Sequence, residues 1–220
     1  MDLEYEKFIE YKKLIEDKRI CIVGPSPILI GKNLGELIDS YDIVVRVNYS
    51  IGVPIQYQND YGFKNDVWYI CGFPFLNFVN VETLLEKKIK FICFKSRQRF
   101  FEFNGRDKIN CLCFEDIMYC DDVLGLLTTK HILTLRPKEL FVAGFSFYTT
   151  EEHYLNGITD YFGDKFIDYV KENNIISNPN IHNLDYYRNW FKEKVNNNEI
   201  ILDDESYKCL FRQNKASNES

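Results

Sequence analysis

The stretch that most constrains the fold of this chain runs from residue 20 to residue 48. It begins with an apolar run, Ile-Cys-Ile-Val, which ends at Gly24 and shows no alternation of polar and apolar residues. Such a run is typical of a parallel strand that helices cover on both faces. A second apolar run, Ile-Val-Val-Arg-Val, ends directly before Asn48. The segment therefore predicts a strand, a tight turn, a short helix and a second strand, the arrangement with which α/β proteins present backbone N–H groups and polar side chains to a nucleotide.

The glycine spacing after the first strand excludes two common phosphate-binding motifs. The dinucleotide-binding fingerprint needs a second glycine two positions after Gly24, where this chain has Ser26. A Walker A loop needs four residues before its Gly-Lys pair, whereas six residues separate Gly24 from Gly31, and Asn33 stands where serine or threonine is required. Hydrolysis of ATP or GTP through a P-loop is therefore not expected.

Strand-like and helix-like segments alternate through residue 144. Further strands are expected at residues 66–71, 90–95, 109–114 and 139–145, and helices at residues 3–15, 81–88, 126–135 and 184–195. This order favours an α/β fold with a largely parallel twisted sheet and helices on both faces. We expect one domain over residues 1–212, followed by a polar C-terminal tail at residues 213–220.

Composition indicates an ordered globular protein without a broad basic surface. Hydrophobic residues make up 45% of the 220 residues, which is enough for one sizeable core. Lys and Arg number 27 against 33 Asp and Glu, and the net charge of -6 argues against nucleic acid or an anionic membrane as a partner. Because the N-terminus is charged and no apolar run approaches the length of a membrane span, we expect a soluble, cytoplasmic protein without a transmembrane anchor.

The cysteines do not form a recognisable metal site. Most of them lie in strand-like apolar runs, where cysteine behaves as a small hydrophobic residue. Cys111, Cys113 and Cys120 lack the usual two-residue gap of a zinc site, and no histidine is near them in the sequence. The chain also has no Asp-x-Asp motif. We therefore expect no metal ion.

The segment from residue 19 to residue 48 resembles the long motif of the eukaryotic-type sialyltransferase family. In that family a strand leads into Gly-Asn-Ser-Gly, a helix and Ile-Asp-Ser-His-Asp follow, and a second strand closes on Arg-Met-Asn. At compatible spacing, this chain has Gly24-Pro25-Ser26, Ile38-Asp39-Ser40-Tyr41-Asp42 and Arg46-Val47-Asn48.

Three later segments continue the resemblance in the same order. Residues 123–127, Val-Leu-Gly-Leu-Leu, and a strand that ends in Ala-Gly-Phe at Phe145 are similar to the two ends of the family's short motif. His153-Tyr154 and His182 look like the two remaining motifs, each of which carries one histidine. The four pieces are collinear and extend the resemblance over residues 19–195.

The resemblance implies a GT-A-like variant nucleotide-binding fold and an inverting, metal-independent glycosyltransferase. The donor would be CMP-sialic acid or another CMP-activated ulosonic acid, and the acceptor would be a hydroxyl of a glycan or glycoconjugate. The CMP-sugar is a substrate, so no separate cofactor is implied. In this family a disulfide joins two positions that are Ile20 and Pro137 here, so that bridge cannot form, which fits a reducing compartment.

The resemblance also implies the roles of individual residues. His182 matches the family's general base, and an imidazole that titrates near neutrality can accept a hydroxyl proton. His153 matches the histidine that donates to the departing phosphate, and Tyr154 follows it in the chain. The positions that match those holding the donor nucleotide are Gly24, Ser26, Asn48 and Gly125.

Two departures from the family pattern support an alternative function. Pro25 replaces an asparagine that contacts the nucleotide, and Val123 and Leu124 replace Ser-Thr ahead of Gly125. These changes would suit a catalytically silent protein that binds CMP or a nucleotide sugar with the same fold. A structural protein without nucleotide affinity is a third alternative.

Each candidate residue also has an ordinary structural explanation. Gly24 and Ser26 could form a strand-to-helix turn with a helix cap, and Asn48 could stabilise a turn. Arg46 could be a ligand or an ion-pair partner. The two motif histidines could lie in surface turns, and His131, inside the helix at 126–135, is expected to be structural.

Overall fold

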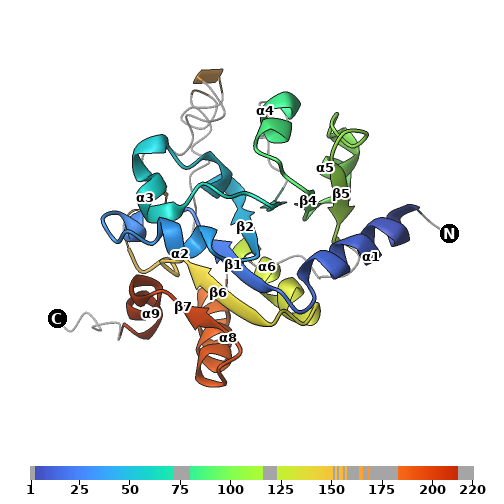
Figure 1. Ribbon diagram of the computed structural model, residues 1–220. Coiled ribbons are helices and arrows are strands. Elements are labelled where there is room, and N and C mark those ends of the chain that lie inside the picture. The colour runs from blue at the N-terminus through green and yellow to red at the C-terminus, as the bar shows by residue number, and fades with distance from the viewer. Residues whose placement is uncertain are drawn as a thin grey trace.

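A parallel sheet organises the part of the chain that the computed structural model describes, namely residues 3–71, 80–115, 123–150, 152, 154–155, 157, 164–165, 168 and 183–212. Seven strands form this sheet in the order β5-β4-β3-β2-β1-β6-β7, and every neighbouring pair is parallel (Figure 1). The strands are β1 (Arg19–Val23), β2 (Ile43–Val47), β3 (Val67–Ile70), β4 (Phe91–Phe94), β5 (Asn110–Cys113), β6 (Glu139–Ala143) and β7 (Ile201–Leu202).

Helices connect the strands, as parallel pairing requires. The α-helices are α1 (Leu3–Ile15), α2 (Gly35–Asp39), α3 (Gln58–Tyr61), α4 (Val81–Glu86), α5 (Arg97–Glu102), α6 (Leu124–Thr134), α8 (Leu184–Asn196) and α9 (Asp204–Phe211). Three short 3₁₀ helices are η1 (Pro27–Leu29), η2 (Asn48–Gly52) and η3 (Ile55–Tyr57). The strands and helices predicted from apolar runs are thus present, with ends that differ by a few residues.

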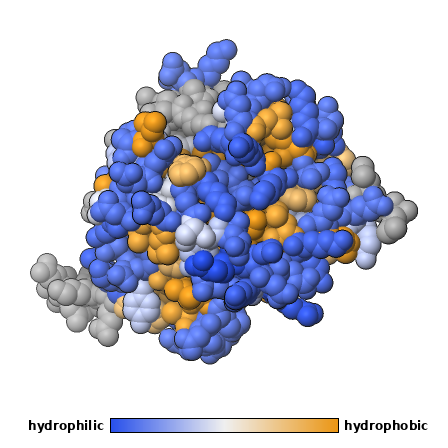
Figure 2. Space-filling model, viewed as in Figure 1, coloured by the Kyte–Doolittle hydropathy of each residue, from blue (hydrophilic) through white to orange (hydrophobic). Residues whose placement is uncertain are grey.

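Two hydrophobic cores lie on opposite faces of the sheet, because successive residues of a strand point to opposite sides. Ile20 and Ile22 of β1 belong to the first core, which α1, α6, α8 and α9 cover. Cys21 and Val23 belong to the second core, which the shorter helices α2 to α5 cover. The prediction of helices on both faces is confirmed. Figure 2 shows that hydrophilic residues predominate on one outer face, where hydrophobic residues form separate small patches.

The strand order places a topological switch point between β1 and β6. From β1 the chain adds β2, β3, β4 and β5 successively on one side, and then returns to add β6 and β7 on the other side of β1. In open α/β sheets, ligands bind outside the carboxyl ends of the strands at such a point. Gly24 directly follows β1, and Gly144 directly follows β6. These two strand ends are therefore the expected place of a ligand site.

His131 has the structural role that its place in a helix predicted. Its Nδ1 atom lies 2.5 Å from the Tyr69 hydroxyl, which lies 2.8 Å from the Tyr11 hydroxyl. Burial lowers the pKa of His131 to about 4, so its imidazole is neutral at physiological pH. This buried hydrogen-bonded chain connects α6, β3 and α1 through the first core.

Candidate functional site

The carboxyl ends of β1 and β6 approach each other closely at two glycines. The Gly24 N–H donates to the Ala143 carbonyl at 2.8 Å. A Cβ atom on Gly24 would lie 2.5 Å from the Gly144 carbonyl oxygen and 2.5 Å from the Phe145 ring, so a side chain does not fit there. Gly144 has a φ of 73°, a left-handed conformation that glycine adopts without strain. Both glycines therefore allow a close backbone approach at the switch point.

Gly125 meets the same phenylalanine from the other side of the site. It lies in the first turn of α6, and a Cβ atom on it would lie 2.7 Å from the Phe145 ring. Val123, which precedes this helix, makes no side-chain capping hydrogen bond. The N–H groups of a first helical turn lack partners within the helix and favour negative charge. The structure thus brings Gly24, Gly125 and an uncapped helix start together around one aromatic ring.

Ser26 is the candidate whose hydrogen bonds are incomplete. It is 3% exposed, and its Oγ atom has no hydrogen-bond partner among the described residues. Its backbone is held firmly, since its N–H donates to Gly144 at 3.3 Å and its carbonyl accepts from the Tyr61 hydroxyl at 2.5 Å. Although Ser26 precedes η1, its side chain makes no capping hydrogen bond, which argues against a mere helix cap. Because buried hydroxyls are nearly always paired, the Ser26 hydroxyl keeps an unused capacity for a hydrogen bond.

Other unpaired polar atoms in the described residues lie in different surroundings. Thr128 Oγ1 and His131 Nε2 are buried further along α6 than Gly125, and Arg46 Nη1 is buried at the second core face. Ser26 differs from these three because it follows the carboxyl end of a strand at the switch point.

Arg46 has a structural partner, which is a backbone carbonyl rather than the acidic side chain of an ion pair. Its Nε and Nη2 atoms donate to the Lys64 carbonyl at 3.1 and 3.0 Å, in the loop before β3. Burial lowers the pKa of Arg46 to about 10, although Cys21, Asp39 and Asp66 counteract this effect. Arg46 therefore ties β2 to the neighbouring loop.

Asn48 connects the carboxyl ends of β2 and β3. Its φ of 49° is in the left-handed region, which asparagine tolerates better than most residues. The Asn48 carbonyl accepts from Trp68 Nε1 at 2.8 Å, and its Oδ1 accepts from the Cys71 N–H at 3.3 Å. These contacts engage both oxygen atoms of Asn48 with the end of β3.

Three tyrosines, Tyr49, Tyr148 and Tyr154, gather at the same edge and are called the tyrosine rim below. The Tyr154 ring meets the Tyr49 ring edge-on at 5.0 Å. Burial raises the pKa of all three tyrosines, and the nearby Cys71 raises each one further, so their hydroxyls are neutral. Sequence reasoning identified Tyr154 but missed Tyr49 and Tyr148. The positions of these two tyrosines in the sequence could have indicated them, because Tyr49 follows Asn48 and Tyr148 follows the turn after β6.

The two catalytic candidates, His153 and His182, lie outside the described residues, as does the predicted tail at 213–220. On the described side of His182, α8 begins at Leu184 as predicted. Asn183 caps this helix, because its Oδ1 accepts from the Tyr186 N–H at 3.0 Å.

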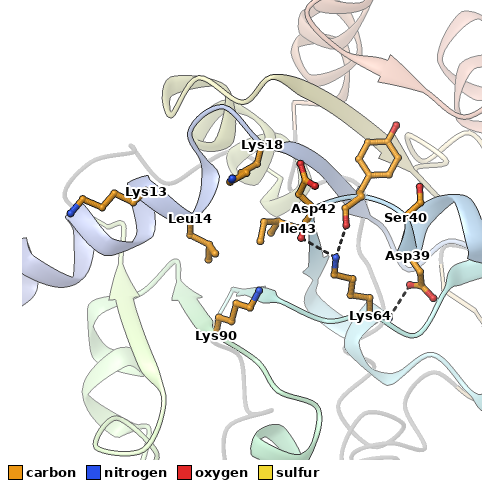
Figure 3. A pocket seen from close by; sticks show the side chains of 10 residues that line it. Lys13, Leu14, Lys18, Asp39, Ser40, Asp42, Ile43, Lys64 and Lys90 are labelled. Carbon is orange, nitrogen blue, oxygen red and sulfur yellow. Dashed lines mark hydrogen bonds between the residues drawn. The ribbon is translucent and has the colours of Figure 1, made fainter.

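A cleft of about 520 Å³ lies at the opposite edge of the sheet, before the strands begin (Figure 3). Two of its lysines are engaged with nearby oxygen atoms. Lys64 Nζ donates to the Tyr41 and Asp42 carbonyls at 2.5 and 2.9 Å, and Lys90 forms an ion pair with Asp66 at 2.8 Å. These contacts join the loops that precede β2, β3 and β4, so Lys64 and Lys90 have a structural role at this edge.

Two general features bear on the kind of protein. Within the described ranges, no group of three or more His, Cys, Asp or Glu residues could hold a metal ion. None of the helices that the structure describes has both the length and the apolar character needed to cross a bilayer.

Comparison with known proteins finds similarity to one family of glycosyltransferases. Residues 9–103 match the family model of glycosyltransferase family 29 (sialyltransferase). A crystal structure of a mammalian sialyltransferase in complex with Gal-beta-1-3GalNAc-ortho-nitrophenol is similar, with a TM-score of 0.53 and 15% identity, over 87% of this chain and 71% of the other. A second structure of a mammalian sialyltransferase has a TM-score of 0.53 and 14% identity, over 92% of this chain and 79% of that one. No curated protein sequence matches the chain. The α/β fold predicted from the sequence is confirmed, and residues 9–103 of the chain are similar to glycosyltransferase family 29 (sialyltransferase).

Proposed function

We propose that this chain transfers sialic acid, or a related ulosonic acid, from a CMP-linked donor to a hydroxyl of a glycan. The transfer inverts the anomeric carbon and needs no metal ion. The observation that carries the proposal is the buried, unpaired Ser26 hydroxyl beside Gly24 and close to the start of α6. These are the residues that resemble donor-nucleotide positions in the family.

Each part of the site suits a different part of the donor. The start of α6 at Gly125 offers backbone N–H groups and a favourable dipole to the phosphate. Ser26 Oγ and Asn48 Nδ2 offer hydrogen bonds to ribose or cytosine. The tyrosine rim supplies flat, neutral rings beside them.

The chemical step needs a base and a means of stabilising the leaving phosphate. The acceptor hydroxyl oxygen forms a bond to the anomeric carbon and loses its proton to His182. The bond between that carbon and the phosphate oxygen breaks, and its electron pair leaves with CMP. His153 donates a hydrogen bond to the departing phosphate. CMP carries one phosphate group, so side-chain and helix donors can replace the metal ion that a nucleoside diphosphate usually requires.

The replacement of asparagine by Pro25 is compatible with donor binding. Proline lacks an N–H group but keeps its carbonyl, and the Pro25 carbonyl accepts from the Leu155 N–H at 2.7 Å. This hydrogen bond holds the segment that carries Tyr154 next to the turn after β1. The substitution therefore removes a ligand contact without removing a contact on which the local structure depends.

A catalytically silent CMP-binding or nucleotide-sugar-binding protein is the second candidate. Val123 provides no side-chain cap at the start of α6, and Pro25 provides no amide, so the donor would form fewer hydrogen bonds than the family pattern offers. Fewer hydrogen bonds to the leaving CMP lower the rate of sugar transfer if those contacts strengthen in the transition state.

Two measurements test these alternatives. Thermal shift with CMP, UMP and GMP should show stabilisation by CMP, because a ligand that binds the folded state raises the unfolding temperature. Hydrolysis of CMP-sialic acid should then be detectable for the wild type and lost in His182→Ala, with unchanged CMP affinity in that variant. CMP binding without turnover in the wild type would favour the silent protein, and the absence of any nucleotide binding would refute both candidates.

A further inference from the structure

The segment that follows β7 is buried against the turn after β6. β7 pairs with β6 through Phe141↔Ile201 and Val142↔Leu202, and the Asp203 N–H then donates to the Val142 carbonyl at 3.2 Å. Asp203 is 4% exposed and precedes α9. The proposed donor-binding turn thus has the start of α9 as its neighbour on the side away from β1.

Asp203 does more than cap its own helix. Its Oδ1 accepts from the N–H groups of Glu205 and Ser206 at 2.9 and 3.0 Å, which is the usual geometry of a helix cap. Its Oδ2 accepts from the Gly144 N–H at 3.0 Å and from the Ser206 hydroxyl. The second oxygen therefore holds a residue of the turn rather than the helix.

Ser206 holds the next residue of the turn. Its side chain is fully buried, and its Oγ accepts from the Phe145 N–H at 2.9 Å. Gly144 and Phe145 come after the end of β6, so the sheet supplies no partner for their N–H groups. Two side chains at the start of α9 supply these partners instead.

The turn held in this way contacts three of the predicted donor-binding residues. The Phe145 ring fills the space beside both Gly24 and Gly125. The Gly144 carbonyl accepts from the Ser26 N–H at 3.3 Å. A shift of this turn would therefore move the backbone of Ser26 and open the space beside the two glycines.

A salt bridge adds a second connection between α9 and the same region. Glu205 forms an ion pair with Lys32 at 2.9 Å, and α9 also packs on η1, the helix that directly follows Ser26. Exposed ion pairs contribute little to stability, so we assign the positioning effect to the buried hydrogen bonds.

We infer that Asp203 and Ser206 are positioning residues that set the donor affinity of this chain by fixing the Gly144-Phe145 turn. They lie beyond residues 9–103, the part that matches the family model. They need not touch the donor, because they act through the turn. The inference rests on the proposed function, since it takes CMP as the ligand of the turn.

The test compares three variants of the full chain. Asp203→Asn keeps a good helix cap but places an amide donor toward the Gly144 N–H, and Ser206→Ala removes the acceptor of the Phe145 N–H. Cys209→Ala is the control, because Cys209 is buried in the same helix and makes no hydrogen bond to the turn in the described structure. CMP affinity is measured by calorimetry well below the unfolding temperature of each variant.

We expect Asp203→Asn and Ser206→Ala to weaken CMP binding about tenfold. The KM for the CMP-sugar should rise in parallel, whereas the KM for the acceptor should stay as in the wild type. Cys209→Ala should lose stability but keep its CMP affinity. Wild-type CMP affinity in Ser206→Ala, or an equal loss in Cys209→Ala, would overturn the inference.

Hydrogen exchange separates a failure of this inference from a failure of the proposed function. If the wild type binds no CMP, the proposed function is wrong, but positioning of the turn can still be measured. The Ser26 amide should then exchange faster in Ser206→Ala than in Cys209→Ala. Equal protection of that amide in the two variants would overturn the inference whether or not CMP binds.

Discussion

At the amino edge of the sheet, Asp39, Asp42 and Asp66 accept hydrogen bonds from backbone N–H groups at the starts of strands and in loops. At the carboxyl edge, the Ser26 hydroxyl is buried without a partner, and Gly24 leaves no room for a side chain. The amino edge contains a cleft of about 520 Å³, and two of the lysines that line it, Lys64 and Lys90, are already engaged with nearby oxygen atoms.

This contrast teaches that a polar residue is judged by its remaining hydrogen-bonding capacity rather than by its presence in a motif. Both aspartates of the motif at residues 38–42 serve the backbone, since Asp39 accepts from Lys64 N–H at 2.9 Å and Asp42 from Arg19 N–H at 2.8 Å. The hydroxyl of Ser26, from the same extended motif, forms no hydrogen bond within the described residues. These hydrogen bonds give the aspartates of the amino edge a stabilising role, whereas the proposed donor site lies at the carboxyl edge.

The largest effect should come from a side chain at the carboxyl edge. Gly24→Ala would place a methyl group against the Gly144 carbonyl and the Phe145 ring, at a cost of about 3 kcal/mol in stability. Gly31→Ala is the control, because Gly31 has a φ of 75° but open space around it, and should cost about 1 kcal/mol. Urea unfolding measures both variants, and equal costs would contradict the close packing at Gly24.

His131, whose Nε2 atom is unpaired inside the first core, should affect stability rather than CMP binding. The folded pKa of His131 is about 4, below its unfolded value, so between these values the unfolded chain binds the proton and stability falls as pH falls. The loss should reach about 3 kcal/mol once the pH is near 4. His131→Asn cannot titrate, so its stability should approach that of the wild type as pH falls from 7. A difference independent of pH would contradict a neutral buried imidazole.

At the amino edge, removing a carboxylate should destabilise the fold without affecting CMP. Asp66 is 5% exposed, accepts from the Val44 N–H at 2.9 Å and pairs with Lys90. Asp66→Ala should therefore cost about 2 kcal/mol in unfolding free energy. Calorimetry should give unchanged CMP affinity, and weakened binding would show that the two edges are not independent.

The smallest effect on stability is expected at Ser26. Ser26→Ala removes a hydroxyl that has no protein partner, so the unfolding free energy should change by less than about 0.5 kcal/mol. CMP affinity should fall about fivefold, which corresponds to one hydrogen bond of about 1 kcal/mol. A variant with lower stability and normal CMP affinity would place Ser26 among the structural residues instead.

Local pattern was sufficient for much of the fold and for the choice of candidates. The apolar run ending at Gly24 and the run at residues 139–145 predict strands, and the structure forms β1 and β6 there, with β6 ending at Ala143. A strand that is buried on both faces is apolar at nearly every position, so it can be recognised without knowing which strands lie beside it. The role of Arg46 could not be decided in this way, because the Lys64 carbonyl that accepts its hydrogen bonds belongs to another segment.

Part of the site depends on contacts that no local pattern encodes. One oxygen of Asp203 caps its own helix within three residues, but the second oxygen binds Gly144, which lies 59 residues away. In the sequence, Phe145 is predicted to end a strand. In the structure, its ring fills the space beside Gly24 and Gly125. Side chains that meet through tertiary packing have no fixed spacing, so their partners appear only in three dimensions.

The amino-acid sequence by itself determined the parallel α/β architecture and the resemblance to sialyltransferases, because buried strands and motif residues are local features of the chain. Tertiary structure alone decided which polar groups are already satisfied and which are not. That distinction separates Asp39 from Ser26, and it arises because hydrogen-bond partners are supplied by segments that folding brings together.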